Sequence, residues 1–170
     1  AALLVLAALK SQEKAVVDVI VAALSHPDPL LKGYALRYCE DIHPKACLPS
    51  LLHFLDDTDA DLRTRSRQLL PDFGQASVRP LLQHAKDGNR SYQPAAVHVL
   101  SRIRGKAAWN GILQFLATGD TEFNKAICDD IAQTLRDMTD KEQADFCAVL
   151  ETFTVSLDAQ NQRPALVSAL

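Results

Sequence analysis

The sequence predicts an all-α fold, a right-handed α-α superhelix (α-solenoid) of about five stacked helix pairs. Two observations lead to this prediction: a stripe of apolar residues that recurs every 30 or 31 residues, and a polar turn that follows each stripe at a constant distance. Hydrophobic residues make up 48% of the 170 residues, which is enough to bury a core without disulfides or metals. A short helix pair cannot bury its apolar face alone, so repeats of this size are expected to stack.

The first helix of each repeat is indicated by apolar residues at positions i, i+3, i+4 and i+7, which lie on one face of a helix. Four blocks of the sequence share this stripe. Its members are Val17, Ile20, Val21 and Leu24, then Leu48, Leu51, Leu52 and Leu55, then Val78, Leu81, Leu82 and Ala85, and finally Trp109, Ile112, Leu113 and Leu116. Trp109 is therefore interpreted as a core residue.

The second helix of each repeat follows a residue whose side chain can accept hydrogen bonds from the free N–H groups at a helix start. These predicted caps are Asp28, Asp59, Asn89 and Asp120. A second apolar stripe begins three residues after each cap, and its first two positions are Leu31 and Ala35, Leu62 and Ser66, Tyr92 and Ala96, and Phe123 and Ile127. Pro94 would disrupt the third of these helices if it began at the usual offset. We therefore expect that helix to begin late, with Ser91 as its cap.

The predicted repeats form a single domain. They occupy residues 12–43, 44–74, 75–104, 105–137 and 138–170, after a partial helix over 1–10. The last repeat diverges, with a first helix over 139–154 that places Phe146, Val149, Leu150 and Phe153 on one face, and the start of a second helix over 164–170. Both ends of the sequence are apolar, whereas the ends of a solenoid need a polar outer face. We therefore expect the chain to be a segment of a longer protein.

The turn and second helix carry a family resemblance. The pattern Asp28-x-x-Leu31-Lys32-x-x-Ala35-x-x-x-Cys39, repeated as Asp59-x-x-Leu62-Arg63-x-x-Ser66-x-x-x-Leu70, resembles the HEAT-repeat signature over about residues 12–135. The short period is most similar to the HEAT-like repeats of the phycobilisome-lyase type. The resemblance implies a ladder between the turn aspartate and the basic residue of neighbouring repeats, although Gln93 and Asn124 replace that basic residue in the third and fourth repeats.

The resemblance also implies that the second helices line a concave binding face. That face would carry the residues opposite each buried stripe. The predicted partner-binding residues are Arg37, Glu40, Gln68, His98, Ser101, Lys125 and Asp129. These positions vary between repeats while the core positions are regular, which suits recognition of a protein or peptide, and the alternative is that they are ordinary solvated residues.

The sequence predicts no catalytic site, no cofactor and no metal centre. Cys39, His43 and Cys47 are separated by three residues each and have side chains that suit zinc. Cys39, however, stands in a core column, and His43 precedes Pro44 where its helix must end, so the core interpretation is preferred. The four cysteines include no C-x-x-C pair, which favours free thiols in a reducing, cytoplasmic setting.

Enzymes built from HEAT-like repeats provide the alternatives. Deoxyhypusine hydroxylases use His-Glu pairs, and this sequence contains none. Alkylpurine DNA glycosylases use a basic face and a tryptophan, and residues 61–106 contain nine Lys or Arg against three Asp or Glu. These basic residues do not share one helix face, so nucleic acid is disfavoured.

We favour a non-catalytic protein–protein interaction scaffold, with a glycosylase relative or a bilin-lyase relative as the alternative. Membrane insertion is not expected, because a spanning helix needs about 20 apolar residues. The apolar run at the start of the sequence ends at Lys10.

Overall fold

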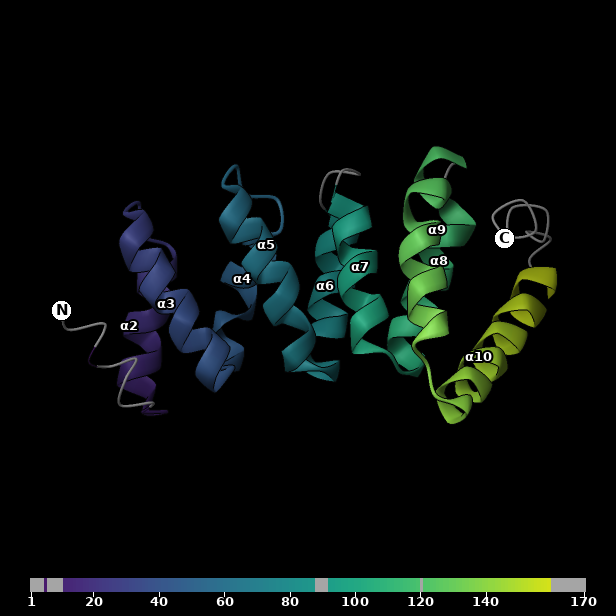
Figure 1. Ribbon diagram of the computed structural model, residues 1–170, viewed down its shortest axis with the longest axis horizontal. Coiled ribbons are helices and arrows are strands. Elements are labelled where there is room, and N and C mark those ends of the chain that lie inside the picture. Colours follow the sequence, from purple (N-terminus) through teal and green to yellow (C-terminus); the bar gives the residue numbers. More distant parts are fainter. Residues whose placement is uncertain (1–4, 6–10, 88–91, 120, 160–170) are drawn as a thin grey trace. The chain divides into compact units, whose positions relative to one another are not determined.

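The computed structural model describes residues 5, 11–87, 92–119 and 121–159, and the regular elements in this part of the chain are all helical (Figure 1). The chain divides into two compact units, residues 1–80 and 81–170. The boundary falls inside a helix, at Pro80. The all-α class that the sequence predicts is confirmed for the described residues.

The first unit contains two helix pairs. Its elements are α2 (Lys14–Leu24), α3 (Pro29–Ile42), the 3-10 helix η1 (Lys45–Cys47), α4 (Leu48–Phe54), α5 (Ala60–Leu69) and the 3-10 helix η2 (Leu70–Phe73), followed by α6 (Gln75–Asp87), which continues into the second unit. Within the first unit α2 packs against α3 and α4 against α5, and α3 also contacts α5. The second helices of the two pairs are therefore neighbours.

Two of the predicted helix caps are confirmed in this unit. Asp28 precedes α3, and its Oδ1 accepts a hydrogen bond from the Leu30 amide at 2.9 Å. Asp59 precedes α5 in the same way and accepts from the Asp61 amide at 2.8 Å. Each cap satisfies one of the N–H groups that a helix start leaves free, which stabilises the helix by about 1 kcal/mol.

The core of the first unit is built from the two predicted stripes. Completely buried side chains come from α2, α3, α4, α5 and η2, namely Ile20, Leu24, Ala35, Cys39, Leu51, Ser66 and Leu70. The second stripe is less regular than predicted, because Leu31 is only half-buried. Full burial of each large aliphatic side chain contributes about 1.5–3 kcal/mol.

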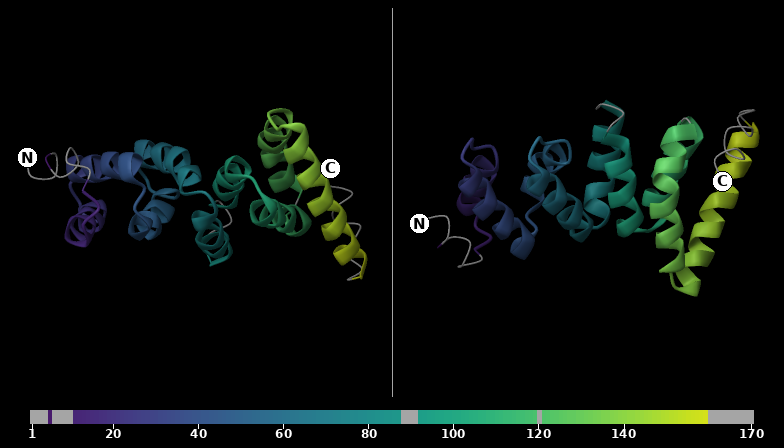
Figure 2. Two further views of the ribbon diagram at one scale, coloured as in Figure 1. Left: turned by 90° about the horizontal axis from the view of Figure 1, so that it is seen from below. Right: turned by 45° about the horizontal axis from the view of Figure 1, so that its top comes forward.

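The second unit contains α7 (Gln93–Ile103), α8 (Lys106–Thr118), α9 (Thr121–Arg136) and α10 (Asp140–Ala159), seen from two further directions in Figure 2. α7 contacts both α8 and α9, and α8 contacts α10. Second helices therefore lie beside second helices, and first helices beside first helices. This is the neighbour relation that the repeat pattern predicts.

Trp109 of α8 lies in the core of this unit, as predicted. It is 1% exposed, and its ring meets that of Phe146 of α10 edge to face, with the ring centroids 5.1 Å apart. Ile112, Leu113 and Ile127 are buried with it. Aromatic pairs of this geometry stabilise by about 0.5–1.5 kcal/mol beyond the area that they bury.

The second helix of the third repeat begins late, as predicted. α7 begins at Gln93 with Pro94 in its first turn, where the missing N–H is not needed, and no side chain caps it. α10 runs to Ala159, five residues beyond the predicted end at Thr154. The predicted caps Asn89, Ser91 and Asp120 and the helix predicted over 164–170 lie outside the described residues, as does the helix predicted over 1–10 apart from Val5.

The basic residues of the expected HEAT ladder have other contacts in the first unit. Arg63 Nη1 donates to the carbonyl oxygens of Asp57 at 2.7 Å and Thr58 at 2.8 Å, both in the turn before its own helix. The Lys32 ammonium lies 5.6 Å from the centroid of the Phe54 ring. The charged link between the neighbouring second helices is instead made by Arg65 and Glu40.

Candidate interaction surface

The exposed face of α3 and α5 in the first unit carries three of the predicted partner-binding residues. Arg37 and Gln68 are exposed. Glu40 is already engaged within the chain, because its Oε1 accepts hydrogen bonds from Arg65 Nε at 3.0 Å and Nη2 at 2.8 Å. Glu40 therefore joins α3 to α5, and Arg37 and Gln68 are the residues of this face that remain for a partner.

The face of α7 and α9 in the second unit carries the other four. Lys125 and Asp129 are exposed and His98 is half-buried. The predicted position of Ser101 on the open surface is wrong, because this residue is 2% exposed. Its hydroxyl donates to the His98 carbonyl at 2.8 Å, one helical turn back, so it turns in toward its own helix.

A polar cavity of about 470 Å³ opens between α7 and α9, next to these residues. It is lined by His98, Ser101, Arg102, Arg104, Gln133, Thr134 and Asp137. Of the seven predicted partner-binding residues, the structure brings His98 and Ser101 together in this cavity. Arg102 and Arg104 were not predicted to belong to the site, although the Arg-x-Arg string at the end of a second helix within a basic stretch is a signal for them.

Arg104 is held in an unusual backbone conformation at the end of α7, with φ 59° and ψ −179°. This region of the φ/ψ map is populated almost only by glycine, so a side chain there is strained by about 1–3 kcal/mol. The Arg104 amide still donates to the Leu100 carbonyl at 3.1 Å, which closes the helix. The side chain is thereby directed away from α7 toward the start of α10.

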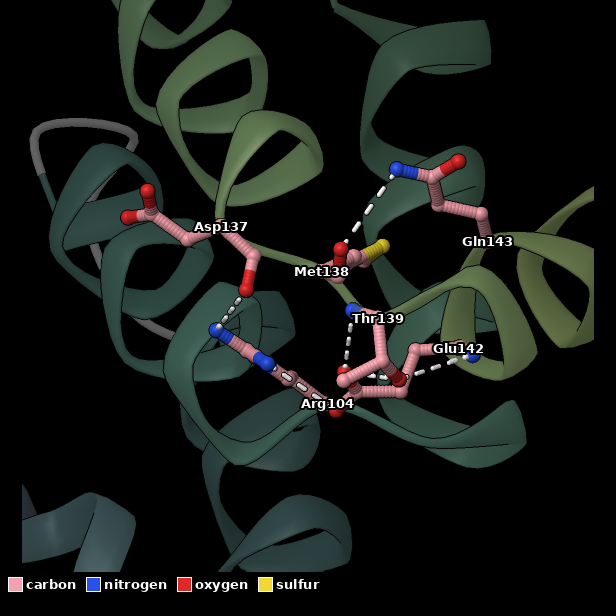
Figure 3. Close-up of polar contacts among 6 residues, drawn as sticks. All are labelled: Arg104, Asp137, Met138, Thr139, Glu142 and Gln143. Carbon is pink, nitrogen blue, oxygen red and sulfur yellow. Dashed lines mark hydrogen bonds and ion pairs between the residues drawn. The ribbon is translucent and has the colours of Figure 1, made fainter.

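Figure 3 shows what the Arg104 guanidinium reaches. Its Nη1 donates to Glu142 Oε1 at 2.9 Å, and its Nη2 lies 3.4 Å from the Asp137 carbonyl oxygen. Glu142 Oε2 also accepts from the amide and the hydroxyl of Thr139, both at 2.9 Å, and Thr139 caps the start of α10 in return. The Thr139 backbone bond and the Arg104 guanidinium together lower the pKa of Glu142 to about 2.

The charged side chains around the α7–α9 cavity differ in whether they have a partner within the chain. The Asp137 carboxylate accepts from Gln133 Nε2, which is 3.1 Å from each of its oxygens. Arg104 is partly neutralised by Glu142. Arg102 is exposed, and its side chain makes no hydrogen bond or ion pair within the described ranges 11–87, 92–119 and 121–159. The cavity therefore presents an available guanidinium.

A second and larger cavity, of about 700 Å³, lies in the same unit between α8 and α10. Its lining includes the amides of Asn110 and Gln114, the hydroxyls of Thr118 and Thr152, and the rings of Phe115 and Phe153. Sequence reasoning did not predict it, because its position depends on how far α8 and α10 separate along their length.

The zinc interpretation of Cys39, His43 and Cys47 is not supported by the described residues, which contain no group of three or more His, Cys, Asp or Glu placed to hold a metal ion. Both cysteines are fully buried. His43 Nε2 is 3.5 Å from Asp72 Oδ2 without making a hydrogen bond, and its ring meets that of Phe73 edge to face. The preferred core interpretation of Cys39 is confirmed.

In comparisons with known proteins, no family model, no curated protein and no solved structure matches this chain. Within the part of the chain that the structure describes, no helix is both long and apolar enough to cross a bilayer.

Proposed function

We propose that this chain is a non-catalytic protein–protein interaction scaffold, a right-handed stack of HEAT-like helix pairs that binds a peptide segment on the face of its second helices. The observation that best supports this is the α7–α9 cavity, where His98, Arg102 and Arg104 meet between two second helices. The cavity lies on the face that variation between repeats picks out in the sequence. The proposal includes a reducing, cytoplasmic setting, which rests on the spacing of the cysteines.

The chemistry of the cavity favours an acidic peptide. Arg102 offers a planar pair of N–H donors that matches a carboxylate, and Arg104, which is ion-paired with Glu142, lines the same cavity. The Asp137 carboxylate also lines the cavity and accepts hydrogen bonds from Gln133 Nε2. A volume of about 470 Å³ is within the range of small-ligand pockets and accommodates one or two side chains.

The test uses three fluorescent peptides of equal length in which leucine alternates with glutamate, glutamine or lysine. Fluorescence polarisation should show binding of the glutamate peptide in preference to the other two. The R102E variant should weaken that binding by about tenfold or more, because it replaces an attraction with a repulsion. R79E is the matched control, because Arg79 is exposed on α6, a first helix.

Three results would contradict the proposal. The first is equal binding of all three peptides, or of none. The second is equal loss of affinity in R102E and R79E, which would mean that net charge rather than the cavity decides. The third is displacement of the glutamate peptide by duplex DNA at physiological salt, which would favour a nucleic-acid site.

A further inference from the structure

The cavity of about 700 Å³ between α8 and α10 has no part in the proposed scaffold role, which uses the face of the second helices. Lys86 from the last turn of α6 and Gln93, the first residue of α7, complete its lining. Its described lining residues all belong to the second unit. The volume is within the range of small-molecule sites, which is about 300–1,000 Å³.

Tight contacts fix the helices around this cavity. A Cβ built on Gly111 of α8 would lie 2.5 Å from Leu82 Cδ2, so α8 approaches the last turns of α6 closely. Trp109 of α8 meets Phe146 of α10 with the ring centroids 5.1 Å apart. Lining residues follow these contacts by one or two helical turns, namely Lys86, Phe115 and Phe153. The walls of the cavity are therefore set by packed side chains.

One part of the lining is apolar. Phe115 is 6% exposed, and Ala117 and Phe153 are half-buried. An apolar body in the cavity is attracted by the area that it buries against these side chains, and an aromatic ring can also pack edge to face on Phe153.

The polar part of the lining is rich in hydrogen-bond donors. The amides of Gln93, Asn110 and Gln114 and the ammonium of Lys86 line the cavity. None of these side chains makes a hydrogen bond or ion pair with the residues that the structure describes. Each amide has two N–H donors and the ammonium has three, whereas an ionised carboxylate only accepts. The lining is thus complementary to a carboxylate.

The charge of the lining points the same way. A smaller cavity of about 200 Å³ shares Asn110 and Thr152 with the first and adds Lys106. Residues 107–170 contain ten Asp or Glu, yet no described Asp or Glu lines either cavity. The lysines therefore give this surface a positive charge within an acidic part of the chain, which favours a negatively charged ligand.

We propose that the α8–α10 cavity binds a small carboxylate that carries an aromatic ring. The ring packs against Phe115, Ala117 and Phe153, and the carboxylate accepts hydrogen bonds from the Lys86 ammonium and from the amides of the lining. The site lies between first helices, so it does not depend on the peptide site between α7 and α9.

The experiment titrates the full chain with three compounds that share a phenyl ring and a three-carbon chain and differ in the end group. They are 3-phenylpropanoate, 3-phenylpropanamide and 3-phenylpropan-1-amine, and saturation-transfer NMR measures the Kd of each. We expect the carboxylate to bind with a Kd of about 1 mM, which is typical of so small a ligand. It should bind about fivefold or more tighter than the amine, with the amide between them.

Variants locate the bound compound. K86E should weaken binding of the carboxylate by about fivefold or more and change that of the amide much less, because it replaces an attraction with a repulsion. K141E is the matched control, since Lys141 is exposed on α10 and lines neither cavity. A117F should weaken binding of all three compounds by filling the cavity, and its control is A144F, because Ala144 is exposed on α10 away from the lining.

Equal affinity for the three compounds would overturn the proposal, as would the absence of binding of the carboxylate at about 10 mM. Equal losses in K86E and K141E, or an A117F variant that keeps its helices by circular dichroism and binds the carboxylate as well as A144F does, would also overturn it. R102E tests the other cavity: a loss as large as that in K86E would place the carboxylate between α7 and α9 instead. Lys86 is exposed, so K86E keeps the proposal testable if A117F does not fold.

Discussion

Ser66 on α5 is a buried hydroxyl with no hydrogen-bond partner among the described groups. A polar group in this state lowers stability by about 1–3 kcal/mol. The equivalent positions in the first and third repeats are Ala35 and Ala96, both fully buried. The core therefore accepts a methyl group where Ser66 has its hydroxyl.

We expect S66A to raise the free energy of unfolding by about 1 kcal/mol, measured by urea denaturation. The matched control is S77A, because Ser77 is equally buried but donates to the Gly74 carbonyl at 2.8 Å and lies 3.2 Å from the Leu70 carbonyl. That variant should lose about 1 kcal/mol. Changes of the same sign in both variants would show that hydrogen-bond satisfaction does not govern these two positions.

Glu142 makes the stability of the second unit depend on pH. Its pKa falls from 4.5 to about 2 in the folded chain, first because the Thr139 amide donates to it and then because Arg104 does. A group whose pKa is lower in the folded state adds stability above its unfolded pKa and loses it as the pH falls through the folded value. The contribution of Glu142 is therefore complete above pH 4.5 and is lost between pH 4.5 and 2.

We expect E142Q to have a lower melting temperature than the unmodified chain at pH 6, and this difference to shrink as the pH is lowered to 2. Thermal denaturation followed by circular dichroism between pH 2 and 6 measures it. D145N is the control, because Asp145 is exposed on the same helix. A difference between E142Q and the unmodified chain that does not change with pH would contradict the assigned role.

Residue patterns reveal the core better than they reveal the site. Trp109 and the small residues Ala35, Ser66 and Ala96 were recognisable because burial repeats with the helical period. The position of Arg104 could not be recognised from the sequence, because a positive φ at an arginine produces no periodic sequence pattern. Glu142 could have been found, since Thr139-x-x-Glu142 is the sequence signature of a capping box.

At the scale of helices, two glycines differ in whether there is room for a side chain, one inside α3 and one directly after α8. A Cβ built on Gly33, inside α3, would have its nearest neighbour, Arg65 Nη1, at 4.0 Å. A Cβ on Gly119, which ends α8, would lie 2.9 Å from the Phe115 carbonyl oxygen and 2.7 Å from Asn124 Oδ1. The contact at Gly33 is an ordinary van der Waals distance. The contacts at Gly119 are too short, and one of them is with the Phe115 backbone, which cannot move independently of its helix.

We expect G33A to stabilise the chain by about 0.5–1 kcal/mol, because alanine lowers the entropy cost of forming a helix. G119A should destabilise it by about 1–3 kcal/mol, because the added methyl overpacks a tight helix end. Urea denaturation of both variants checks the pair. A stabilised G119A would mean that the close approach of α8 and α9 at this point is not required.

The residues at which α3 and α5 begin were better predicted than the contacts between helices. Asp28 and Asp59 begin α3 and α5 as expected, because a cap acts on the amides directly after it in the sequence. The Glu40–Arg65 link was not predicted, since both residues are polar positions on different helices and only packing decides which face each other. The partner-binding interpretation of Glu40 missed this for the same reason.

At the scale of the whole molecule, the repeat pattern predicts one continuous stack, in which each helix pair supports its neighbours. The fluorescence of Trp109 can test this coupling, because Trp109 is the only tryptophan in the sequence and is buried in the second unit. L51A creates a cavity in the first unit, where Leu51 is fully buried, and such changes destabilise by about 2–5 kcal/mol. In a coupled stack, that loss should lower the urea midpoint of Trp109 fluorescence as well as that of far-UV circular dichroism.

L100A provides the positive control for this measurement, because Leu100 is fully buried in the same unit as Trp109 and must shift its fluorescence in either case. The informative comparison is between the midpoint shifts of the two variants. Nearest-neighbour coupling predicts a smaller shift for L51A than for L100A, since only the interface energy passes from one unit to the other. A Trp109 transition that L51A leaves unmoved, beside a separate earlier loss of helix signal, would mean that residues 1–80 and 81–170 fold independently, and the single stack would have to be abandoned.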